Sequence, residues 1–556
     1  MKTRLPKLCG GDFELANFIL GLEMPSGTAA LASHLLLREF DGLPLARKSL
    51  SLCYCRACVA RRQALENGYT TTEALSEECL LSKSGSTYNA QDWARKFLWN
   101  GGCAYIDLSH LELCIAEVLS AKDHVAASRA MLLLARAAMK MANARLPEGK
   151  RIVVLANNSD GQGHSYGSHI NFLVTRSAWT DLFERRLHHL LFLAAYQASS
   201  IIFTGQGKVG SENNRPSVDY QISQRADFMD MLMGSQTTFT RPLVNSRDEA
   251  LCGSWYDRSA DSTSKARLHV IFYDHTLCDT ASFLKIGVMQ IILAMIEAGR
   301  VRTHLLLDDP VEALCLWSHD PTLRSRARLT SGRSLTAVEL QLLLYEEAHR
   351  FVAAGGCDGV VPEAPLILEL WSDTLHKLRQ RDFAMLARRL DWVLKLQLLE
   401  RAREHRAGLD WSSPELKHLD FLYASLDENG LFWALEKNGQ VDKLVTDEQV
   451  ERFCTEPPEN TRAWTRGMLL RLAEPRQVER VDWDSMTFSV ERDGYWTRDK
   501  TIKLTDPLGF TKTACESAFQ GGATLEEVLV NLGADASPVQ SPIAVKAEPS
   551  TTHRQV

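Results

Sequence analysis

The sequence predicts an α+β protein in which strands and helices dominate different stretches of a 556-residue chain. Short segments in the first half, such as residues 103–108 and 267–273, are rich in apolar residues or alternate in polarity, which is typical of strands. Residues 334–405 instead carry apolar side chains at helical spacing, so the middle third is expected to be mostly helical. Strand-like alternation returns at residues 478–504.

The remaining elements follow in order along the chain. An inserted mobile loop is expected at residues 40–90, which are rich in Cys, Ser, Thr and Gly. Residues 534–556 are rich in Ala, Ser and Pro without periodicity, which predicts a disordered tail. The predicted strands are residues 8–15, 103–108, 151–156, 171–175, 218–223 and 267–273. The predicted helices are residues 27–39, 122–144, 177–199 and 280–298, with several more within 334–405.

Composition argues against several classes of protein. The chain is 45% hydrophobic and 24% charged with a net charge of −6, which is ordinary for a globular protein and gives no overall attraction to nucleic acid or anionic lipid. The 13 cysteines are odd in number and have no framework spacing, which favours reduced thiols and a cytoplasmic location. The longest apolar stretches, residues 190–203 and 283–298, are shorter than the roughly 18–20 residues that span a membrane, so both are expected to be buried helices.

Two acidic strand segments offer candidate metal ligands. Asp12 and Glu14 are two residues apart on a predicted strand, so both carboxylates point to one face and can share a divalent cation. Tyr105 and Asp107 share a strand face in the same way, with Glu112 just beyond the end of that strand. On residue type alone, each segment is also consistent with an ordinary polar strand face.

Histidines and arginines in polar surroundings complete the set of candidate site residues. Arginine binds phosphate oxygens through paired N–H groups, and a histidine that ends a Gly-rich polar turn is a better ligand candidate than a lone histidine. Each arginine is also consistent with a structural ion pair or a solvated helix face. The candidates are His169, His269, Arg225, Arg267, Arg462 and Arg466.

The sequence contains no Walker loop, no GxGxxG fingerprint and no GxSxG elbow. Acidic strand ends together with histidines and arginines are instead the residue types expected at a Mg-ATP site on the surface of a sheet. In their order along the chain, these segments resemble the family of the Pup ligase and the deamidase/depupylase of Pup (Dop), which are relatives of glutamine synthetase. The resemblance runs from Gly10 to about Leu508. The motifs that carry it are GGDFE, NGGCAYIDLSHLE, NNSDGQGHSYGSHINFLV, YQISQRADF, NSRDE, ARLHVI, LDWVLK and EPPENTRAWTRG.

This resemblance implies a glutamine synthetase-like (carboxylate-amine ligase) fold, in which helices pack on a curved antiparallel sheet that holds ATP and Mg²⁺. It implies a catalytic domain at residues 1–410, a small C-terminal domain at 411–533 and the tail at 534–556. Asp107 falls on the catalytic aspartate of the family. The implied metal-binding positions are Asp12, Glu14, Tyr105, Glu112, His169 and His269. The implied phosphate contacts are Arg225, Arg267, Arg462 and Arg466.

The insertion between Glu14 and Asp107 favours the depupylase branch, because by resemblance the ligases cover this interval with fewer residues. The activity implied is hydrolysis of the isopeptide that joins a Pup-like modifier to a substrate lysine, or of a C-terminal glutamine amide of the modifier. ATP would act as a bound cofactor that is not consumed at each turnover, and either Asp107 or a phosphate would be the nucleophile. The implied partners are the Pup-like modifier and its lysine-conjugated substrates, with a link to a bacterial proteasome or another protease system.

Several positions depart from the pattern of the family. Asp12 stands where the family has Glu, Leu111 replaces a Pro, Ile170 replaces an acidic residue, and Cys252 begins a segment that replaces His-Ala-Asp. Two alternatives therefore stay open: a Pup ligase-like enzyme that forms isopeptides, and a catalytically weakened homologue that binds the modifier. The loop cysteines have no standard zinc-ligand spacing and are interpreted as free thiols; they are Cys53, Cys55, Cys58 and Cys79.

Overall fold

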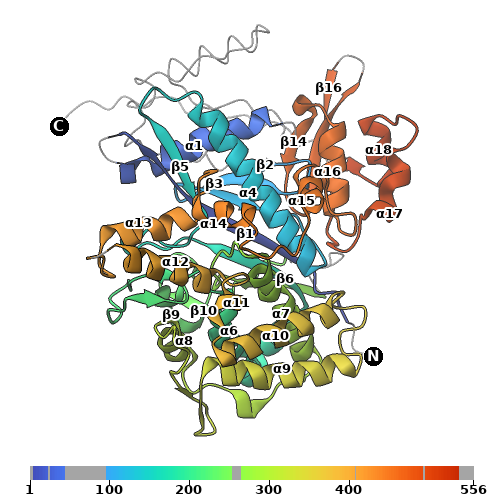
Figure 1. Ribbon diagram of the computed structural model, residues 1–556. Coiled ribbons are helices and arrows are strands. Elements are labelled where there is room, and N and C mark those ends of the chain that lie inside the picture. The colour runs from blue at the N-terminus through green and yellow to red at the C-terminus, as the bar shows by residue number, and fades with distance from the viewer. Residues whose placement is uncertain are drawn as a thin grey trace, which may run out of the picture.

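The computed structural model describes residues 4–22, 25–43, 95–252, 264–406, 408–492 and 495–536. Most of the loop predicted at residues 40–90, with its four cysteines, lies outside the described residues, as does the predicted tail from residue 537. The described residues form a large antiparallel sheet, helices that pack against it, and a smaller C-terminal sheet (Figure 1).

The large sheet has seven antiparallel strands in the order β11-β6-β1-β4-β3-β2, with β5 paired to the second half of β1. The long first strand therefore has three partners, because β6 and β4 flank its first half. This topology confirms the predicted antiparallel sheet. The strands are β1 (Cys9–Leu20), β2 (Lys96–Phe97), β3 (Cys103–Asp107), β4 (His110–Cys114), β5 (Arg151–Leu155), β6 (Ser168–Thr175) and β11 (Lys265–Val270).

Alternation along β1 gives the sheet one apolar and one polar face. Cys9, Phe13 and Leu15 are buried in the main apolar core, whereas Asp12 and Glu14 point to the opposite face. Three helices cover the apolar face: one packs on β1 and β4, one on β1 and β5, and one on β6. In that order they are α1 (Ala29–Glu39), α4 (Ala121–Asn143) and α7 (Asp279–Glu297).

Two apolar helices lie in the centre of the fold. α7 and α6 (Leu187–Thr204) are long and apolar enough to cross a bilayer, but 94% and 83% of their apolar windows are buried within the fold. The two helices pack against each other. Both stretches are therefore core helices, as the sequence predicts.

The middle third is helical, as predicted. Local signals set the helix boundaries: Thr336 and Glu339 form a capping box at the start of α9, and Pro310 begins α8 behind the capping carboxylate of Asp309. The helices of this region are α8 (Pro310–Ser318), α9 (Ala337–Ala353), α10 (Ala364–Gln380), α11 (Phe383–Leu386), α12 (Asp391–His405), α13 (Pro414–Tyr423), α14 (Leu431–Lys437) and α15 (Asp447–Thr455). Short strand pairs join β7 (Lys208–Val209) to β8 (Tyr220–Gln221), β9 (Met229–Gly234) to β10 (Arg241–Asn245) and β12 (Ala327–Arg328) to β13 (Ser334–Leu335).

The C-terminal part has its own sheet and apolar cluster, shown in orange and red beside β2 and β3 in Figure 1. Its cluster also includes Phe97, Cys103 and Cys114 from the large sheet, so the two parts pack directly together. Helices α13 to α15 belong to the main core instead. The predicted division at residue 410 stays a prediction. The elements are α16 (Ala463–Leu472), β14 (Val478–Val481), β15 (Ser485–Arg492), β16 (Tyr495–Lys503), α17 (Lys512–Cys515), α18 (Leu525–Asn531) and β17 (Asp535–Ala536).

The structure corrects two local predictions. Glu112 does not lie beyond a strand end but on β4, which pairs with β3 through a tight turn at Leu108 and Ser109. The single helix predicted at residues 177–199 is divided into α5 (Arg176–Thr180), a π-helical turn and α6, because Arg186 has non-helical backbone angles. The change in the helix affects no candidate site residue. The change in the strand places Glu112 directly opposite Tyr105.

Candidate active site

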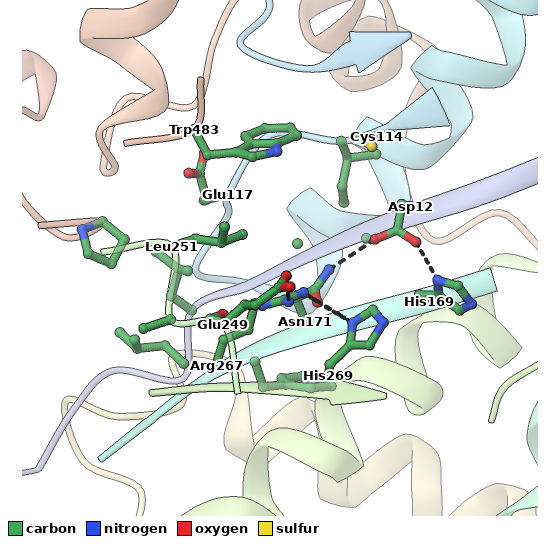
Figure 2. A pocket seen from close by; sticks show the side chains of 18 of the residues that line it. Asp12, Cys114, Glu117, His169, Asn171, Glu249, Leu251, Arg267, His269 and Trp483 are labelled. Atoms are coloured by element: carbon green, nitrogen blue, oxygen red, sulfur yellow. Dashed lines mark hydrogen bonds and ion pairs between the residues drawn. The ribbon is translucent and has the colours of Figure 1, made fainter. Parts of the chain in front are cut away.

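Alternate residues from five strands line a pocket of about 240 Å³ on the polar face of the large sheet. A period of two residues puts every second side chain of β1, β3, β4, β6 and β11 on this face. Figure 2 labels Asp12, Cys114, His169, Asn171, Arg267 and His269 from these strands, and it draws Glu117 and Trp483 across from Arg267 and His269. Eight of the predicted site residues line the pocket: Asp12, Tyr105, Asp107, Glu112, His169, Arg267, His269 and Arg462.

Three carboxylates meet at one end of this face and form a carboxylate trio (Glu14, Asp107 and Glu112). Glu14 lies directly opposite Glu112 in the pairing of β1 with β4, and Asp107 ends the neighbouring strand β3. One carboxylate oxygen from each lies within 4.8 Å of the others. The backbone N–H of Gly167 donates to Glu14 Oε2 at 2.9 Å and holds that side chain in place. The trio presents oxygen ligands of the kind that Mg²⁺ prefers.

Burial and mutual repulsion perturb these carboxylates. The pKa of Glu112 is raised well above its ordinary value, first by burial and then by the negative charges of Asp12 and Glu14. Burial, and after it the charge of Glu14, also raises the pKa of Asp107. The Tyr105 hydroxyl hydrogen-bonds Glu112, and burial raises the pKa of this phenol too. A bound cation would relieve the repulsion, and such crowding is typical of functional sites.

The turn that carries Asp107 has an unusual backbone. Leu108 and Ser109 have φ angles of 42° and 77°, and they connect Asp107 to its strand partner His110. Tight hairpins of this kind need positive φ at both central positions and usually contain Asn and Gly there. Non-glycine residues in this region store strain, which clusters at functional sites. Here the strained turn directly follows Asp107.

A hydrogen-bonded network occupies the other end of the face. His169 Nδ1 lies 2.8 Å from Asp12 Oδ1, and Asn171 donates to Asp12 Oδ2 at 3.1 Å. The Asn171 amide oxygen also accepts from Arg267 Nη1 at 2.7 Å and lies 2.8 Å from His269 Nδ1 (Figure 2). These contacts align two histidines and an arginine on adjacent strands.

Charge in this network is distributed unevenly. Burial alone would raise the pKa of Asp12, but the adjacent His169, together with His269, holds it below the ordinary value. Burial, with His169 and the Arg267 guanidinium beside it, lowers the pKa of His269 well below its ordinary value. A neutral imidazole is the form that binds a metal. The network therefore places an ionised carboxylate and a neutral histidine beside the pocket.

A buried ion-pair cluster connects the pocket to the C-terminal part. Arg462 Nε donates to Glu117 Oε1 at 2.8 Å, and Arg466 Nη2 donates to Glu117 Oε2 at 2.5 Å. Although burial opposes ionisation, the two guanidinium groups lower the pKa of Glu117 to about 2. Arg462 lines the pocket, whereas Arg466 is fully buried behind it and also donates to the Gly101 and Trp483 carbonyls.

Arg225 lies apart from this pocket in the part of the chain that the structure describes. Its Nη1 donates to Ser165 Oγ at 3.1 Å and to the carbonyl of Tyr166, on the side of the fold where Glu14 is held. Burial, and after it the charge of Arg241, lowers the pKa of this guanidinium to about 10. Its Nε is buried without a hydrogen-bond partner. The structure thus brings Arg267 and Arg462 together at the pocket but not Arg225 or Arg466.

Apart from Asp12, the departures from the family pattern lie in two places. Leu111 and Ile170 are buried in the main core, on the face of the sheet opposite the pocket. Neither change therefore alters the polar face. Cys252 is buried and lines the pocket, while residues 253–263 are outside the described residues.

Some pocket residues are absent from the predicted set. Asn171 is one, although its i+2 spacing from His169 on a strand was a usable signal. Glu117 and Trp483 are others, and no local pattern marks either one, because their roles depend on packing between the large sheet and the C-terminal part.

The fold and the polar face together define the class of protein. The antiparallel sheet backed by helices matches the solved structures of the Pup ligase PafA, which have a glutamine synthetase-like (carboxylate-amine ligase) fold, so the predicted fold class is confirmed. The family model described as "Pup-ligase protein" matches residues 51–487. The chain belongs to this family.

The chain is similar to relatives named as depupylases and to a relative named as a Pup ligase. A depupylase from Acidothermus cellulolyticus is 36% identical over 71% of this chain and 76% of its own length. A Pup deamidase/depupylase from Mycolicibacterium smegmatis is 34% identical over 72% and 76%, and a Pup–protein ligase from Acidimicrobium ferrooxidans is 35% identical over 75% and 88%. The solved complex of Pup with its ligase PafA has a TM-score of 0.70 at 22% identity, covering 95% of this chain and 92% of that one. The family predicted from the ordered motifs is thereby confirmed.

Proposed function

We propose that the protein is a depupylase/deamidase-like hydrolase that uses Mg-ATP as a cofactor and cleaves the isopeptide, or the C-terminal glutamine amide, of a Pup-like modifier. The observation that carries this proposal is the carboxylate trio, with Asp107 at its edge, on the polar face of this fold. Relatives named depupylase or Pup deamidase/depupylase support the direction of the reaction.

The donor set fits magnesium. Three carboxylates within 4.8 Å of one another, two with raised pKa values, are stable together only when a cation or a proton offsets their charge. Bound metal would neutralise charge that develops on phosphate and carbonyl oxygens during the reaction. The residues proposed to hold metal are Asp12, Glu14, Tyr105, Glu112, His169 and His269.

The arginines suit a nucleotide. Arg267 and Arg462 both line the pocket, where guanidinium groups can contact phosphate oxygens in pairs. Arg225 has a buried Nε that lacks a partner, and we propose that it contacts a phosphate in the bound state. Arg466 is proposed to support the site by fixing Glu117, and through it Arg462. The solved PafA structure with ADP, with a TM-score of 0.66, has this fold.

Asp107 is proposed to drive the chemical step. Its carboxylate is half-buried and borders the pocket, and its neighbour Glu14 strengthens its affinity for a proton. Asp107 would accept a proton from water as the water oxygen bonds to the amide carbon, or would attack that carbon itself. In the first route the C–N bond then breaks, and the leaving lysine amine or ammonia takes the proton that Asp107 accepted. In the second route the leaving nitrogen takes a proton from a water molecule as the C–N bond breaks. The hydroxide that remains then opens the acyl anhydride formed on Asp107, which restores the Asp107 carboxylate and releases the carboxyl group of the modifier.

Ligation is the second candidate, because the Acidimicrobium Pup–protein ligase is almost as similar and is matched over more of its length. The insertion between Glu14 and Asp107 favours cleavage. A weakened binding homologue is less well supported, since Leu111 and Ile170 face the core. The proposed partners are the modifier and its lysine conjugates, with a link to a proteasome or another protease, in the cytoplasm.

One assay separates these candidates. The protein is incubated with Mg-ATP and either a purified Pup–substrate conjugate or free Pup ending in Glu together with an acceptor protein. Loss of conjugate with release of intact Pup supports the proposal. Conjugate formation would favour ligation, and tight Pup binding without either reaction would favour the binding homologue.

A further inference from the structure

A second cluster of metal-ligating side chains lies away from the pocket on the sheet. Cys315 and His319 are four residues apart at the C-terminal end of α8, and Asp227 lies in the 3₁₀ turn η5 (Ala226–Phe228). The sulfur, a ring nitrogen and a carboxylate oxygen of the three side chains all lie within 4.8 Å of one another.

Both partners of the histidine face the same ring nitrogen. His319 Nε2 lies 2.7 Å from Asp227 Oδ1 and 3.9 Å from Cys315 Sγ. A catalytic triad uses the two ring nitrogens separately, one toward the nucleophile and one toward the acid. Convergence of sulfur and oxygen on a single nitrogen does not fit that arrangement. It is instead the arrangement of three ligands around one cation.

The distances are close to those that tetrahedral zinc requires. With Zn–S of about 2.3 Å and Zn–N and Zn–O of about 2.0–2.1 Å, the ligand atoms of a tetrahedron lie about 3.6 Å apart for S and N and about 3.3 Å apart for N and O. The Cys315–His319 distance of 3.9 Å is already near this value. The Asp227–His319 distance of 2.7 Å has to open by about 0.6 Å, which small side-chain rotations supply.

Outer contacts orient the carboxylate toward the cluster. Asp227 Oδ2 accepts from the backbone N–H of Glu212 at 2.8 Å and from Gln221 Nε2 at 2.7 Å. Oδ1 is therefore left to face His319. Metal ligands are commonly fixed by such outer hydrogen bonds. Cys315 and His319 also have the i, i+4 spacing by which one helix supplies two zinc ligands.

The cluster is open to solvent on one side. Cys315 and His319 line a groove of about 830 Å³. The wall of this groove carries four acidic side chains and one arginine, Arg215, which lies 3.9 Å from Asp230, so acidic groups outnumber basic ones on the wall and favour a cation. The acidic residues are Asp230, Asp308, Asp309 and Glu312.

We propose that Asp227, Cys315 and His319 form a zinc site whose fourth coordination position faces this groove. A thiolate, an imidazole and a carboxylate favour zinc over magnesium, which selects oxygen ligands. The metal would join α8 to the turn that follows Arg225. The site is separate from the pocket on the sheet and does not depend on the reaction proposed there.

The test measures metal on the full-length protein. Protein is loaded with Zn²⁺ in the presence of excess Mg²⁺, unbound metal is removed, and zinc per chain is counted by mass spectrometry. The variants are Cys315→Ser and His319→Ala. Cys454→Ser is the matched control, because Cys454 is also partly exposed and on a helix but lies outside the cluster. A parallel sample with Co²⁺ is scanned for thiolate-to-metal absorption.

We expect Cys315→Ser and His319→Ala each to hold one zinc fewer per chain than the wild type, and Cys454→Ser to hold the same number. The thiolate-to-cobalt absorption should be weaker in Cys315→Ser than in the wild type, and it should be unchanged in Cys454→Ser. If Cys315→Ser does not fold, the zinc content of His319→Ala relative to the wild type tests the proposal. Equal zinc content in the wild type and in the folded cluster variants would overturn the proposal, because the contact of His319 with Asp227 would then be only a structural ion pair.

Discussion

Replacing Glu112 by Gln should stabilise the metal-free protein while removing its response to Mg²⁺. Two unit charges 4.8 Å apart repel by about 3.5 kcal/mol at an effective dielectric constant near 20, and Glu112 faces two other carboxylates within that distance. The folded protein avoids most of this repulsion by keeping Glu112 protonated, as its raised pKa indicates. Holding that proton at neutral pH costs about 1.4 kcal/mol per pH unit. We therefore expect Glu112→Gln to gain roughly 1–3 kcal/mol at pH 7.5.

The sign of the pH dependence follows from linkage. A carboxyl whose pKa is higher in the folded than in the unfolded protein binds a proton on folding, so its unfavourable contribution grows as pH rises above about 4.5. The advantage of Glu112→Gln should therefore be present at pH 7.5 and vanish as pH approaches 4.5.

The assay is urea unfolding with and without Mg²⁺, at both pH values. The control is Glu428→Gln, since Glu428 is an exposed carboxylate paired with Lys140 at the surface. Wild type and control should gain stability from Mg²⁺, whereas Glu112→Gln should not. If metal-free Glu112→Gln is less stable than wild type at pH 7.5, then Glu112 is not repelled by its neighbours, and if Mg²⁺ stabilises it as much as wild type, then Glu112 is not a ligand of the metal.

Three further predictions concern the same region. Asp107→Asn should lose turnover while retaining ATP binding by calorimetry, and turnover near the wild-type rate would remove Asp107 from the mechanism. Glu117→Ala leaves two buried guanidinium groups without their carboxylate, so it should cost about 3–5 kcal/mol in urea unfolding, and a loss below about 1 kcal/mol would contradict the buried cluster. Because the pKa of Glu117 is lowered from 4.5 to about 2, its stabilisation should be present above pH 4.5 and lost toward pH 2 in wild type but not in Glu117→Ala. Ser109→Gly should add about 1 kcal/mol by relieving positive φ, and a destabilised variant would show that this turn is not strained.

Much of the polar face could be predicted from the sequence because strand alternation is local. Asp12 with Glu14, and Tyr105 with Asp107, are pairs whose common face follows from the two-residue period alone. The ordered motifs then identified the family and its fold. Buried helices such as α6 could be predicted equally well, because their length and apolar content are enough to identify them.

The rest depended on contacts that no local pattern records. The strand position of Glu112 was missed because the turn at Leu108 and Ser109 contains none of the Asn or Gly residues that mark tight hairpins. Glu117 pairs with Arg462 across 345 positions of sequence, so neither its burial nor its partners could be inferred. The separation of Arg225 from the pocket likewise follows from tertiary packing, which spacing along the chain does not specify.

We propose that this pocket hydrolyses an amide bond with ATP as a retained cofactor. The most direct measurement counts ADP released against Pup conjugates cleaved over many turnovers of the full-length protein. We expect continued cleavage with far less than one ADP released per bond, and no cleavage when ATP is withheld from nucleotide-free protein. One ADP for every bond processed, or cleavage that needs no nucleotide, would contradict it.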